Sequence, residues 1–493
     1  IHALYTAFND HMTTMDSLAF RILNYVLIDM DGAPLKQAVL DAGLGSDLSG
    51  SYGDSYKQPV WIVEATGSEV DKQAAFADVV DSTLRSIALK GIDKDMLEAA
   101  LNRTEFTARE NDYQGRPKGL FYGVRAMDMW LYDRNPMDAL RYIDDMNTLR
   151  KNLKTNYFEN LLLRYVIKNP HQVLITMKPE KGLTEKANQE TAEKLASFMA
   201  STKALKERQA SGETEEALKT IPLLSRKDLK RPIEEEVLEK ESVSGVDHFH
   251  FQVHTNGITY LNLYFTLVNL KEADIPYAIL LSSLLRSLST TRHSYTELAR
   301  LSNALNGYGK VNDTSSYLPA LTIRAKALTS KTDKLMDLLG EVINHTLFTD
   351  AKRLKELVLQ EKSEWDMSAF SRGHTLVMTR LTSYFSKGGE FAEQSGLSYY
   401  YFLADLVKHF DENREGLQEK LAAVSGKIFT RSGLFFETIG EEEEKKAVLE
   451  NLPLLLDDME VGVKTAPHVY SFPPESRNEA FLTSGKVQYV AKG

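Results

Sequence analysis

Residues 255–267, TNGITYLNLYFTL, indicate how this chain is organised. Asn256-Gly257 is typical of a tight turn, and Ile258–Leu267 alternates between apolar and polar residues well enough to predict a strand directly after it. Ala3–Phe8, near the beginning of the chain, also predicts a strand. The chain therefore carries two strands that can each begin a domain.

The same order of elements is expected after each of these two strands. Each pass predicts two helices, a second strand, a long run of helices and a closing strand, which is His171–Met177 in the first pass and Leu434–Ile439 in the second. The second set of landmarks follows the first by ~255–265 residues, a period that is too long for a solenoid and typical of duplicated domains. We therefore expect an α+β fold with two homologous domains.

A charged segment separates the two copies. Residues 181–245 are rich in Lys, Glu, Gln, Thr and Ala, and they predict a pair of exposed helices around Ala210–Thr214 followed by an extended strap. The expected division is 1–180 for the first copy, 181–245 for the hairpin and strap, 246–464 for the second copy, and 465–493 for a linker and a strand at Ser484–Val490. Because Ile1 and Gly493 both adjoin predicted strands, we expect a piece of a longer protein.

The composition excludes several classes of function. The formal net charge is −10, so nucleic acid is not an expected partner, since phosphate binding needs a basic surface. The chain has no cysteine, which rules out disulfides, thiolate nucleophiles and cysteine metal sites. No apolar run approaches ~20 residues, so neither a transmembrane helix nor a membrane partner is expected. A soluble protein of the cytoplasm or of an organelle matrix is the favoured class.

His248, His250 and His254 are the most metal-like group of residues. Positions i, i+2 and i+6 share one face of a strand, and imidazoles two residues apart can bind zinc from there. No fourth ligand or catalytic carboxylate accompanies them, so a solvent-exposed strand face leading into the Asn256-Gly257 turn is the simpler interpretation. The sequence contains neither HExxH nor HxxEH, the helical patterns of zinc peptidases. The chain alone is therefore not expected to bind zinc.

Three other features have structural interpretations. Gly307-Tyr308-Gly309 lacks the frame of a phosphate-binding loop, so a tight turn after a helix is expected. Asn102–Pro136 mixes charges, aromatic rings, glycine and proline inside a helical run. It is interpreted as a helix pair with buried ion pairs, and the alternative is the wall of a binding cavity. The candidate residues for such a cavity are Glu105, Arg109 and Trp130.

The segment Asn102–Pro136 resembles the presequence-protease (falcilysin-like) branch of the pitrilysin/insulin-degrading-enzyme family of zinc metallopeptidases. The other stretches that carry the resemblance are Asn24–Leu27, Pro34-Leu35, Gly43–Gly45, Thr220–Leu224, Asp228, Thr255–Ile258, Tyr260-Leu261, Gly373-His374, Arg380, Ser383-Tyr384, Ser386 and Gly396-Leu397. Members of this family contain four related α/β-roll domains. The resemblance therefore implies two pitrilysin-type α/β rolls joined by a helical hairpin.

The resemblance also implies which part of such an enzyme this chain forms. In the family, the first domain holds zinc through an HxxEH helix and a more distant glutamate, and the last domain supplies an Arg/Tyr pair for the substrate. The two halves close around a peptide-sized chamber. This chain would cover most of the second domain, the hairpin, the third domain and the first strand of a fourth. Both catalytic portions would lie outside it.

One stretch allows a residue-by-residue comparison with the family's zinc helix. Ser289-Thr290 and Tyr295 resemble the G-T…Y stretch that follows that helix. Counting back from there places the HxxEH positions on Leu280, Ser283 and Leu284, none of which ligates zinc as histidine or glutamate does. We expect a degenerate repeat that kept the fold and lost the site. No catalytic or metal-binding residue is expected in this chain, and zinc would be held elsewhere in the whole protein.

The expected function is that of the central, non-catalytic portion of a zinc metalloendopeptidase that degrades unstructured peptides in a closed chamber. This portion would supply chamber wall and hinge. Its partners would be peptide substrates and the missing N- and C-terminal domains of the same protein. Two alternatives stay open: a catalytically inactive family member that acts as a scaffold, and a complete peptide-binding module unrelated to proteolysis.

Overall fold

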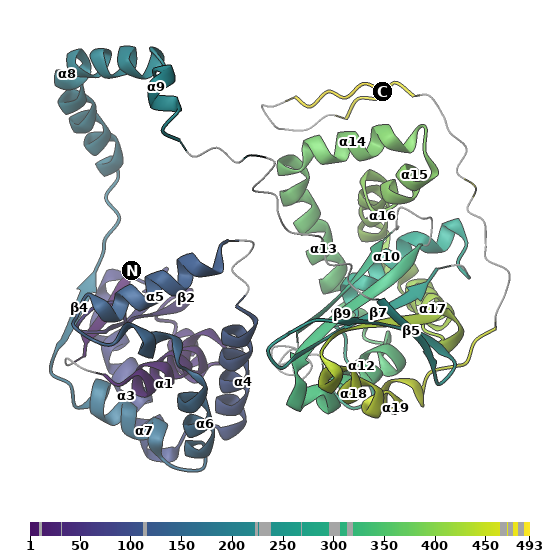
Figure 1. Cartoon of the computed structure of the whole chain (residues 1–493), viewed down its shortest axis with the longest axis horizontal. Coiled ribbons are helices and arrows are strands. Elements are labelled where there is room, and N and C mark those ends of the chain that lie inside the picture. Colours follow the sequence, from purple (N-terminus) through teal and green to yellow (C-terminus); the bar gives the residue numbers. More distant parts are fainter. Residues whose placement is uncertain are drawn as a thin grey trace. The chain divides into compact units, whose positions relative to one another are not determined.

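Two units make up the structure, a computed structural model of the 493-residue chain (Figure 1). The first unit comprises residues 1–92 and 155–235, and the second comprises 93–154 and 236–493. The residues that the structure describes are 1–8, 12–30, 32–111, 116–221, 225, 238–267, 269–294, 306–312, 319–463, 471, 477–481 and 488–493. The domain boundaries expected from the sequence, at residues 180, 245 and 464, stay predictions.

The first unit is built on a four-stranded antiparallel sheet in the order β2-β3-β1-β4. Its strands are β1 (His2–Ala7), β2 (Asp47–Gly53), β3 (Val60–Thr66) and β4 (Gln172–Thr176). Tyr5 lies opposite Ile62 on one side and Val173 on the other, so the first and last strands of this copy are neighbours. The strands expected at Ala3–Phe8 and His171–Met177 are thus confirmed as β1 and β4.

Helices pack against this sheet and continue into the charged segment. They are α1 (Thr14–Asn24), η1 (Tyr25–Asp29), α2 (Pro34–Asp41), η2 (Val70–Lys72), α3 (Gln73–Lys90), α7 (Tyr157–Leu162), η4 (Leu163–Ile167), α8 (Leu183–Ala210) and α9 (Glu215–Leu218). The largest completely buried side chains here include Trp61, Phe20, Phe76 and Phe158. The strap expected after α9 lies mostly outside the described residues.

The second unit is built on a six-stranded sheet in the order β5-β6-β10-β7-β9-β8. Its strands are β5 (Leu238–Val243), β6 (Val246–Gln252), β7 (Ile258–Thr266), β8 (Asn306–Asn312), β9 (Ala320–Leu328) and β10 (Leu434–Gly440). Strands β6 and β10 are parallel, and the other neighbours are antiparallel. The strands predicted at Ile258–Leu267 and Leu434–Ile439 are confirmed as β7 and β10.

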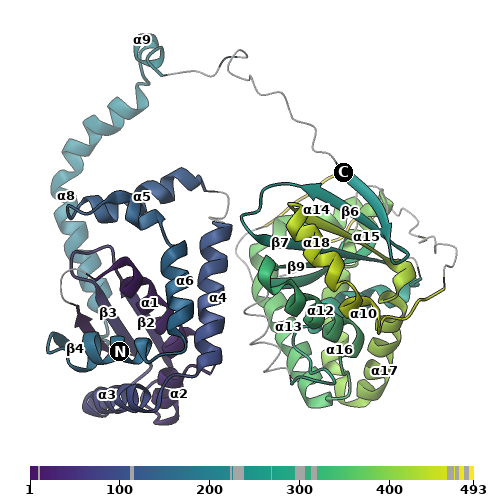
Figure 2. The ribbon, with the colours of Figure 1, turned by 60° about the horizontal axis from the view of Figure 1, so that its bottom comes forward.

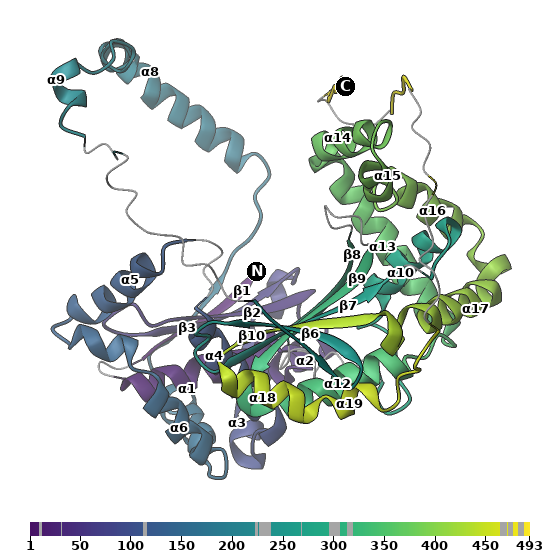
Figure 3. The same ribbon diagram turned by 45° about the vertical axis from the view of Figure 1, so that its right-hand side comes forward.

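Helices of the second unit include α12 and α18, which lie against one face of its sheet (Figures 2 and 3). The helices after β7 are η5 (Glu272–Asp274), α10 (Ile275–Leu284), η6 (Thr329–Lys331), α12 (Thr332–His345), α13 (Ala351–Ser371), α14 (Gly373–Ser383), α15 (Lys387–Glu393), α16 (Leu397–Lys408), α17 (Phe410–Ile428), η7 (Arg431–Gly433), α18 (Glu442–Asn451) and α19 (Pro453–Leu456). No helix in the described parts of the chain is long and apolar enough to cross a membrane.

Residues 93–154 form the remaining helices of the second unit. They are α4 (Lys94–Glu110), α5 (Lys118–Trp130), η3 (Pro136–Leu140) and α6 (Ile143–Asn152). Phe106 of α4 packs with Ile258 of β7 and Leu328 of β9 in a small apolar cluster. This contact fixes α4 to one end of the six-stranded sheet.

The tight turn expected at Gly307-Tyr308-Gly309 is wrong, because these residues lie inside β8. Gly307 pairs with Ala325 and Gly309 with Ile323 across the ladder to β9. Glycine is compatible with a strand when a neighbouring strand supplies the backbone hydrogen bonds, and that pairing is not visible in the local sequence. The helix expected immediately before it falls on residues 295–305, outside the described part of the chain.

Candidate functional site

The three positions aligned with the zinc motif lie on α10. Leu280 and Leu284 are buried in the main core of the second unit. The Ser283 hydroxyl donates a hydrogen bond to the Leu280 carbonyl oxygen at 2.9 Å, which satisfies it within its own helix. These side chains offer no imidazole or carboxylate to a metal ion, so they do not fit zinc. Because Tyr295 lies outside the described residues, the alignment itself stays a prediction.

A carboxyl group that the sequence analysis missed lies beside this position. Glu361 of α13 interacts with Ser283 of α10 and with Tyr399 of α16. Burial raises the pKa of Glu361, and the nearby charge of Glu364 raises it further. Such a carboxyl group is suited to holding a proton next to hydroxyl groups. No sequence signal connects it with Ser283, because the two come from helices far apart in the chain.

His248 and His250 are buried, so the expected solvent-exposed strand face is wrong. Alternation along β6 places both on the same side as Val246, which belongs to the core. The polarity of the two imidazoles concealed this inward face in the sequence. His254 lies beyond the end of β6 and is exposed, with Nδ1 3.2 Å from Glu441 Oε2. The three histidines therefore do not share one face.

A chain of hydrogen bonds satisfies the two buried histidines. Nδ1 of His248 lies 3.1 Å from Glu241 Oε1, and the Thr438 hydroxyl lies 2.8 Å from both His248 Nε2 and His250 Nδ1. A carboxylate only accepts, so His248 donates from Nδ1, Thr438 donates to His248 Nε2, and His250 donates to Thr438. Nε2 of His250 is left buried without a hydrogen-bond partner. In the described part of the chain, no three His, Asp or Glu residues are placed to hold a metal.

Glu105 and Arg109, two of the three cavity candidates, lie together on α4. Glu105 forms ion pairs at 2.8 Å with Arg109 and at 2.7 Å with Arg150 of α6. Arg109 donates to the Asn256 carbonyl oxygen at 3.2 Å, and the Asn256 side chain donates back to the Arg109 carbonyl oxygen at 3.1 Å. The described contacts therefore make these charges a joint between α4, α6 and the turn before β7. Trp130 ends α5, is 66% exposed, and is not brought into this joint.

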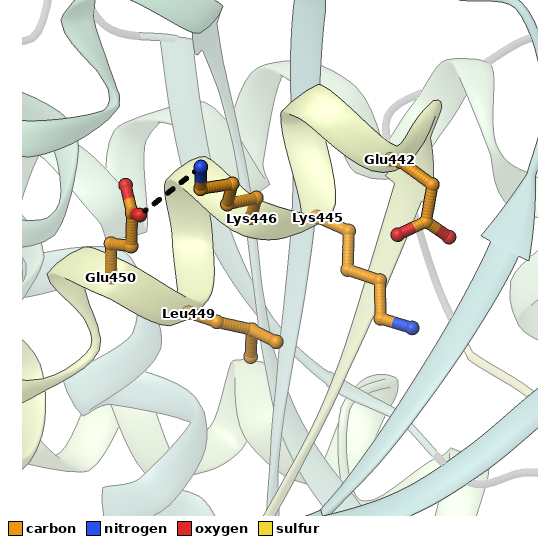
Figure 4. Close-up of a pocket in the computed structure, with 5 residues that line it drawn as sticks. All are labelled: Glu442, Lys445, Lys446, Leu449 and Glu450. Atoms are coloured by element: carbon orange, nitrogen blue, oxygen red, sulfur yellow. Dashed lines mark ion pairs between the residues drawn. The ribbon is translucent and has the colours of Figure 1, made fainter.

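An open hollow on α18 offers no chemistry either (Figure 4). Its lining residues are Glu442, Lys445, Lys446, Leu449 and Glu450. Lys446 pairs with Glu450 at 3.7 Å, and Lys445 pairs with Glu239 of β5 at 2.9 Å. All five residues belong to one helix, and these cations are already paired. The hollow is therefore the ordinary surface of a solvated helix.

Comparisons with known proteins identify the class of this chain. Residues 176–406 match the family described as "Peptidase M16-C associated". A relative from Clostridium perfringens, "Protein HypA", is 34% identical and matches 97% of this chain and 51% of its own length. "Presequence protease 1, chloroplastic/mitochondrial" from Arabidopsis thaliana is 26% identical and matches 96% of this chain and 46% of its own length. The crystal structure of pitrilysin covers 92% of this chain and 46% of its own, at 14% identity and a TM-score of 0.46.

These matches define a chain of the peptidase class. It belongs to the pitrilysin/insulinase family, in the presequence-protease branch, as the sequence resemblance predicted. The chain spans about half the length of the curated relatives it matches.

Proposed function

We propose that this chain is the central, non-catalytic portion of a zinc metalloendopeptidase that degrades unstructured peptides in a closed chamber. The observation that carries the proposal is the burial of Leu280 and Leu284 in the core of the second unit, at the positions aligned with the zinc ligands. The family relationship supports the peptidase class of the whole protein. Zinc would be bound by residues outside this chain, and no catalytic step is assigned to the residues described here.

The role proposed for this portion is to supply chamber wall and the hinge between two halves. Its partners would be peptide substrates and further domains of the same protein. Exposed apolar side chains support the expectation of further domains. Val173, Ile175 and Met177 are each more than 40% exposed in and directly after β4, and Leu120, Val124 and Trp130 are exposed along α5. Apolar surface of this kind usually marks a place that a neighbour covers.

A peptidase assay combined with metal analysis tests the proposal. The purified 493-residue chain is incubated with a fluorescent unstructured peptide, with and without added zinc. We expect no zinc-dependent cleavage and far less than one bound zinc per chain. The protein encoded by the whole gene, assayed in parallel, is expected to cleave the peptide and to lose activity with a chelator. Chelator-sensitive cleavage that co-purifies with the 493-residue chain would show that the proposal is wrong.

The scaffold alternative predicts a different result for the whole gene product. A catalytically inactive family member would contain no intact zinc motif, and its whole gene product would not cleave the peptide. The assay on the whole protein therefore separates an inert portion of an enzyme from an inactive protein. The location proposed for the whole protein is the cytoplasm or an organelle matrix, which the names of the organellar relatives support.

A further inference from the structure

The six-stranded sheet of the second unit has a second face, opposite to its buried core. Along β10, Leu434, Phe436 and Thr438 are buried on the core side. Phe435 and Glu437 alternate with them and are only partly buried, so they point to the opposite face. Strand β7 alternates in the same way, with Leu261 and Leu263 in the core. We call this opposite side the open face.

Three rings on adjacent strands form a continuous strip on the open face. Tyr264 of β7 stacks on Phe435 of β10 with ring centroids 4.8 Å apart and planes inclined by 6°. Phe435 meets Phe249 of β6 edge to face, with centroids 6.0 Å apart. All three rings are partly exposed. We call Phe249, Tyr264 and Phe435 the aromatic strip.

Charged groups beside the aromatic strip are balanced within the face itself. Glu437 accepts hydrogen bonds from Asn262 at 2.7 Å and from the Tyr264 hydroxyl at 3.1 Å. Lys240 of β5 pairs with Asp247 at 3.0 Å, and its ammonium lies 5.2 Å from the centre of the Phe249 ring. The described contacts thus join cations, carboxylates and rings into one layer. Although the whole chain carries a net charge of −10, this layer contains both signs side by side.

The Tyr264 hydroxyl is held in its donating form. Burial raises the pKa of Tyr264 to about 12, with a further contribution from the neighbouring Glu437 carboxylate. The hydroxyl therefore stays protonated at neutral pH and keeps its bond to Glu437. This bond fixes the orientation of the Tyr264 ring, which in turn stacks on Phe435. The strip is a pre-organised surface, which lowers the entropy lost when a ligand binds.

We propose that the aromatic strip binds extended peptide segments through their aromatic and aliphatic side chains. The proposal rests on the proposed function for the class of ligand, and it adds which surface and which side chains are recognised. Alternate side chains of an extended peptide are about 7 Å apart, so three rings at the observed spacing offer room for about two of them. Because the adjacent charges are paired on the face, selection by ligand charge is weak. Sequence-tolerant binding of unfolded, apolar-rich peptides follows.

Fluorescence anisotropy with two labelled peptides tests this proposal on the whole 493-residue chain. The first peptide is an unstructured peptide of about 20 residues of Gly, Ser, Leu and Phe, and in the second every Leu and Phe is replaced by Ser. We expect the first peptide to bind and the second to bind about tenfold more weakly or not at all. We also expect less than about a twofold change in the Kd of the first peptide when salt rises from low to high concentration.

Three variants locate the binding surface. F249S combined with F435S is expected to weaken binding of the apolar peptide by about tenfold, whereas Y264F keeps the ring and is expected to bind within about twofold of the native chain. The matched control is Y401S, which removes an aromatic side chain that is 55% exposed on α16. Thermal unfolding of each variant checks that it is folded.

Several results would overturn the inference. They are equal binding of the two peptides, strongly salt-dependent binding, no binding by the native chain, or binding by folded F249S/F435S that equals that of Y401S. None of these results decides the proposed function, which is tested by cleavage and zinc content. Conversely, zinc-dependent cleavage by the chain would refute the proposed function without moving the binding surface.

Discussion

At the scale of single residues, the second unit contains polar groups that are buried but paired. Glu341 of α12 is 1% exposed and accepts hydrogen bonds from the Arg292 backbone at 2.8 Å and from Arg292 Nε at 2.5 Å. Burial by itself would raise the pKa of Glu341, but hydrogen bonds from Thr290 and Arg292 outweigh it and lower the pKa to about 2. This carboxylate therefore fixes the loop after α10 to α12.

Replacing this carboxylate tests its contribution to stability. We expect E341Q to lower the free energy of unfolding by about 2 kcal/mol, because it removes the charge that Arg292 pairs with. Chemical denaturation followed by circular dichroism measures the change. D337N is the control, since Asp337 pairs with the same arginine at 3.0 Å from an exposed position, where a loss below about 0.5 kcal/mol is expected. Equal losses in the two variants would contradict this account.

The buried histidines predict a dependence of stability on pH. Burial lowers the pKa of His248 below its usual value of 6.5, and the nearby Glu241 only partly opposes this. The folded state therefore favours neutral His248. Its contribution to stability is complete above about pH 6.5 and is lost as the pH falls through the folded-state pKa. Charges that face the pair are Glu239 and Glu241 of β5 and Lys445 of α18.

Urea unfolding at about pH 7.5 and about pH 5.5 measures this effect. The native chain is expected to lose stability over that interval, whereas H248Q, although less stable at the higher pH, is expected to lose less. The interval lies above the range in which the carboxylates with lowered pKa become protonated. An identical pH dependence in the native chain and in H248Q would contradict the assigned role of His248.

Residue-level expectations succeeded where neighbours in sequence decide the contact. The ion pair between Glu105 and Arg109 joins residues one helical turn apart, so buried ion pairs on this segment could be predicted. The third member, Arg150, comes from another helix and could not. The buried side of His248 and the proximity of Glu361 to Ser283 likewise depend on packing between distant elements. Such contacts leave no local signal in a single sequence.

At the scale of elements, the described strands show what a hydrophobic pattern can and cannot predict. β7 and β10 were predicted because their side chains alternate along the strand. β8, with its glycines at 307 and 309, carries no such signal and is defined by its pairing with β9. The helical hairpin and the domain boundaries were expected from composition and from the resemblance, and they stay predictions.

The described C-terminal residues lie against α14. Glu479 pairs with Arg380 at 2.8 and 2.9 Å and accepts a hydrogen bond from Tyr384. Arg380 lowers the pKa of Glu479 to about 2, so the carboxylate is charged at neutral pH. Farther along, the Tyr489 ring lies against Gly373. The segment is therefore attached to α14 at two places.

Limited proteolysis measures this attachment. We expect E479A to increase the rate of trypsin cleavage after Arg477 several-fold, because the ion pair with Arg380 no longer holds the segment against α14. Cleavage is followed by intact mass. The control is E450A, which removes an exposed glutamate from α18. Cleavage of E479A at the same rate as E450A would show that the ion pair does not hold the segment in place.

At the scale of the whole molecule, sequence and structure point to different parts of the account. The family was predicted from motifs scattered along the chain, and the comparisons confirm it. The structure adds the buried leucines on α10, the joint between α4 and the sheet, and the aromatic strip. The chain spans about half the length of its curated relatives, which is why its activity is proposed for a larger protein.

Reconstitution of the whole enzyme from two parts tests the central claim most directly. The 493-residue chain is expressed together with, and separately from, the remainder of the polypeptide encoded by its gene, and zinc-dependent cleavage of an unstructured peptide is measured. Cleavage is predicted only when both parts are present, with the zinc bound to the remainder. Full activity of either part alone would contradict the account of this chain as a necessary, non-catalytic part of a zinc peptidase.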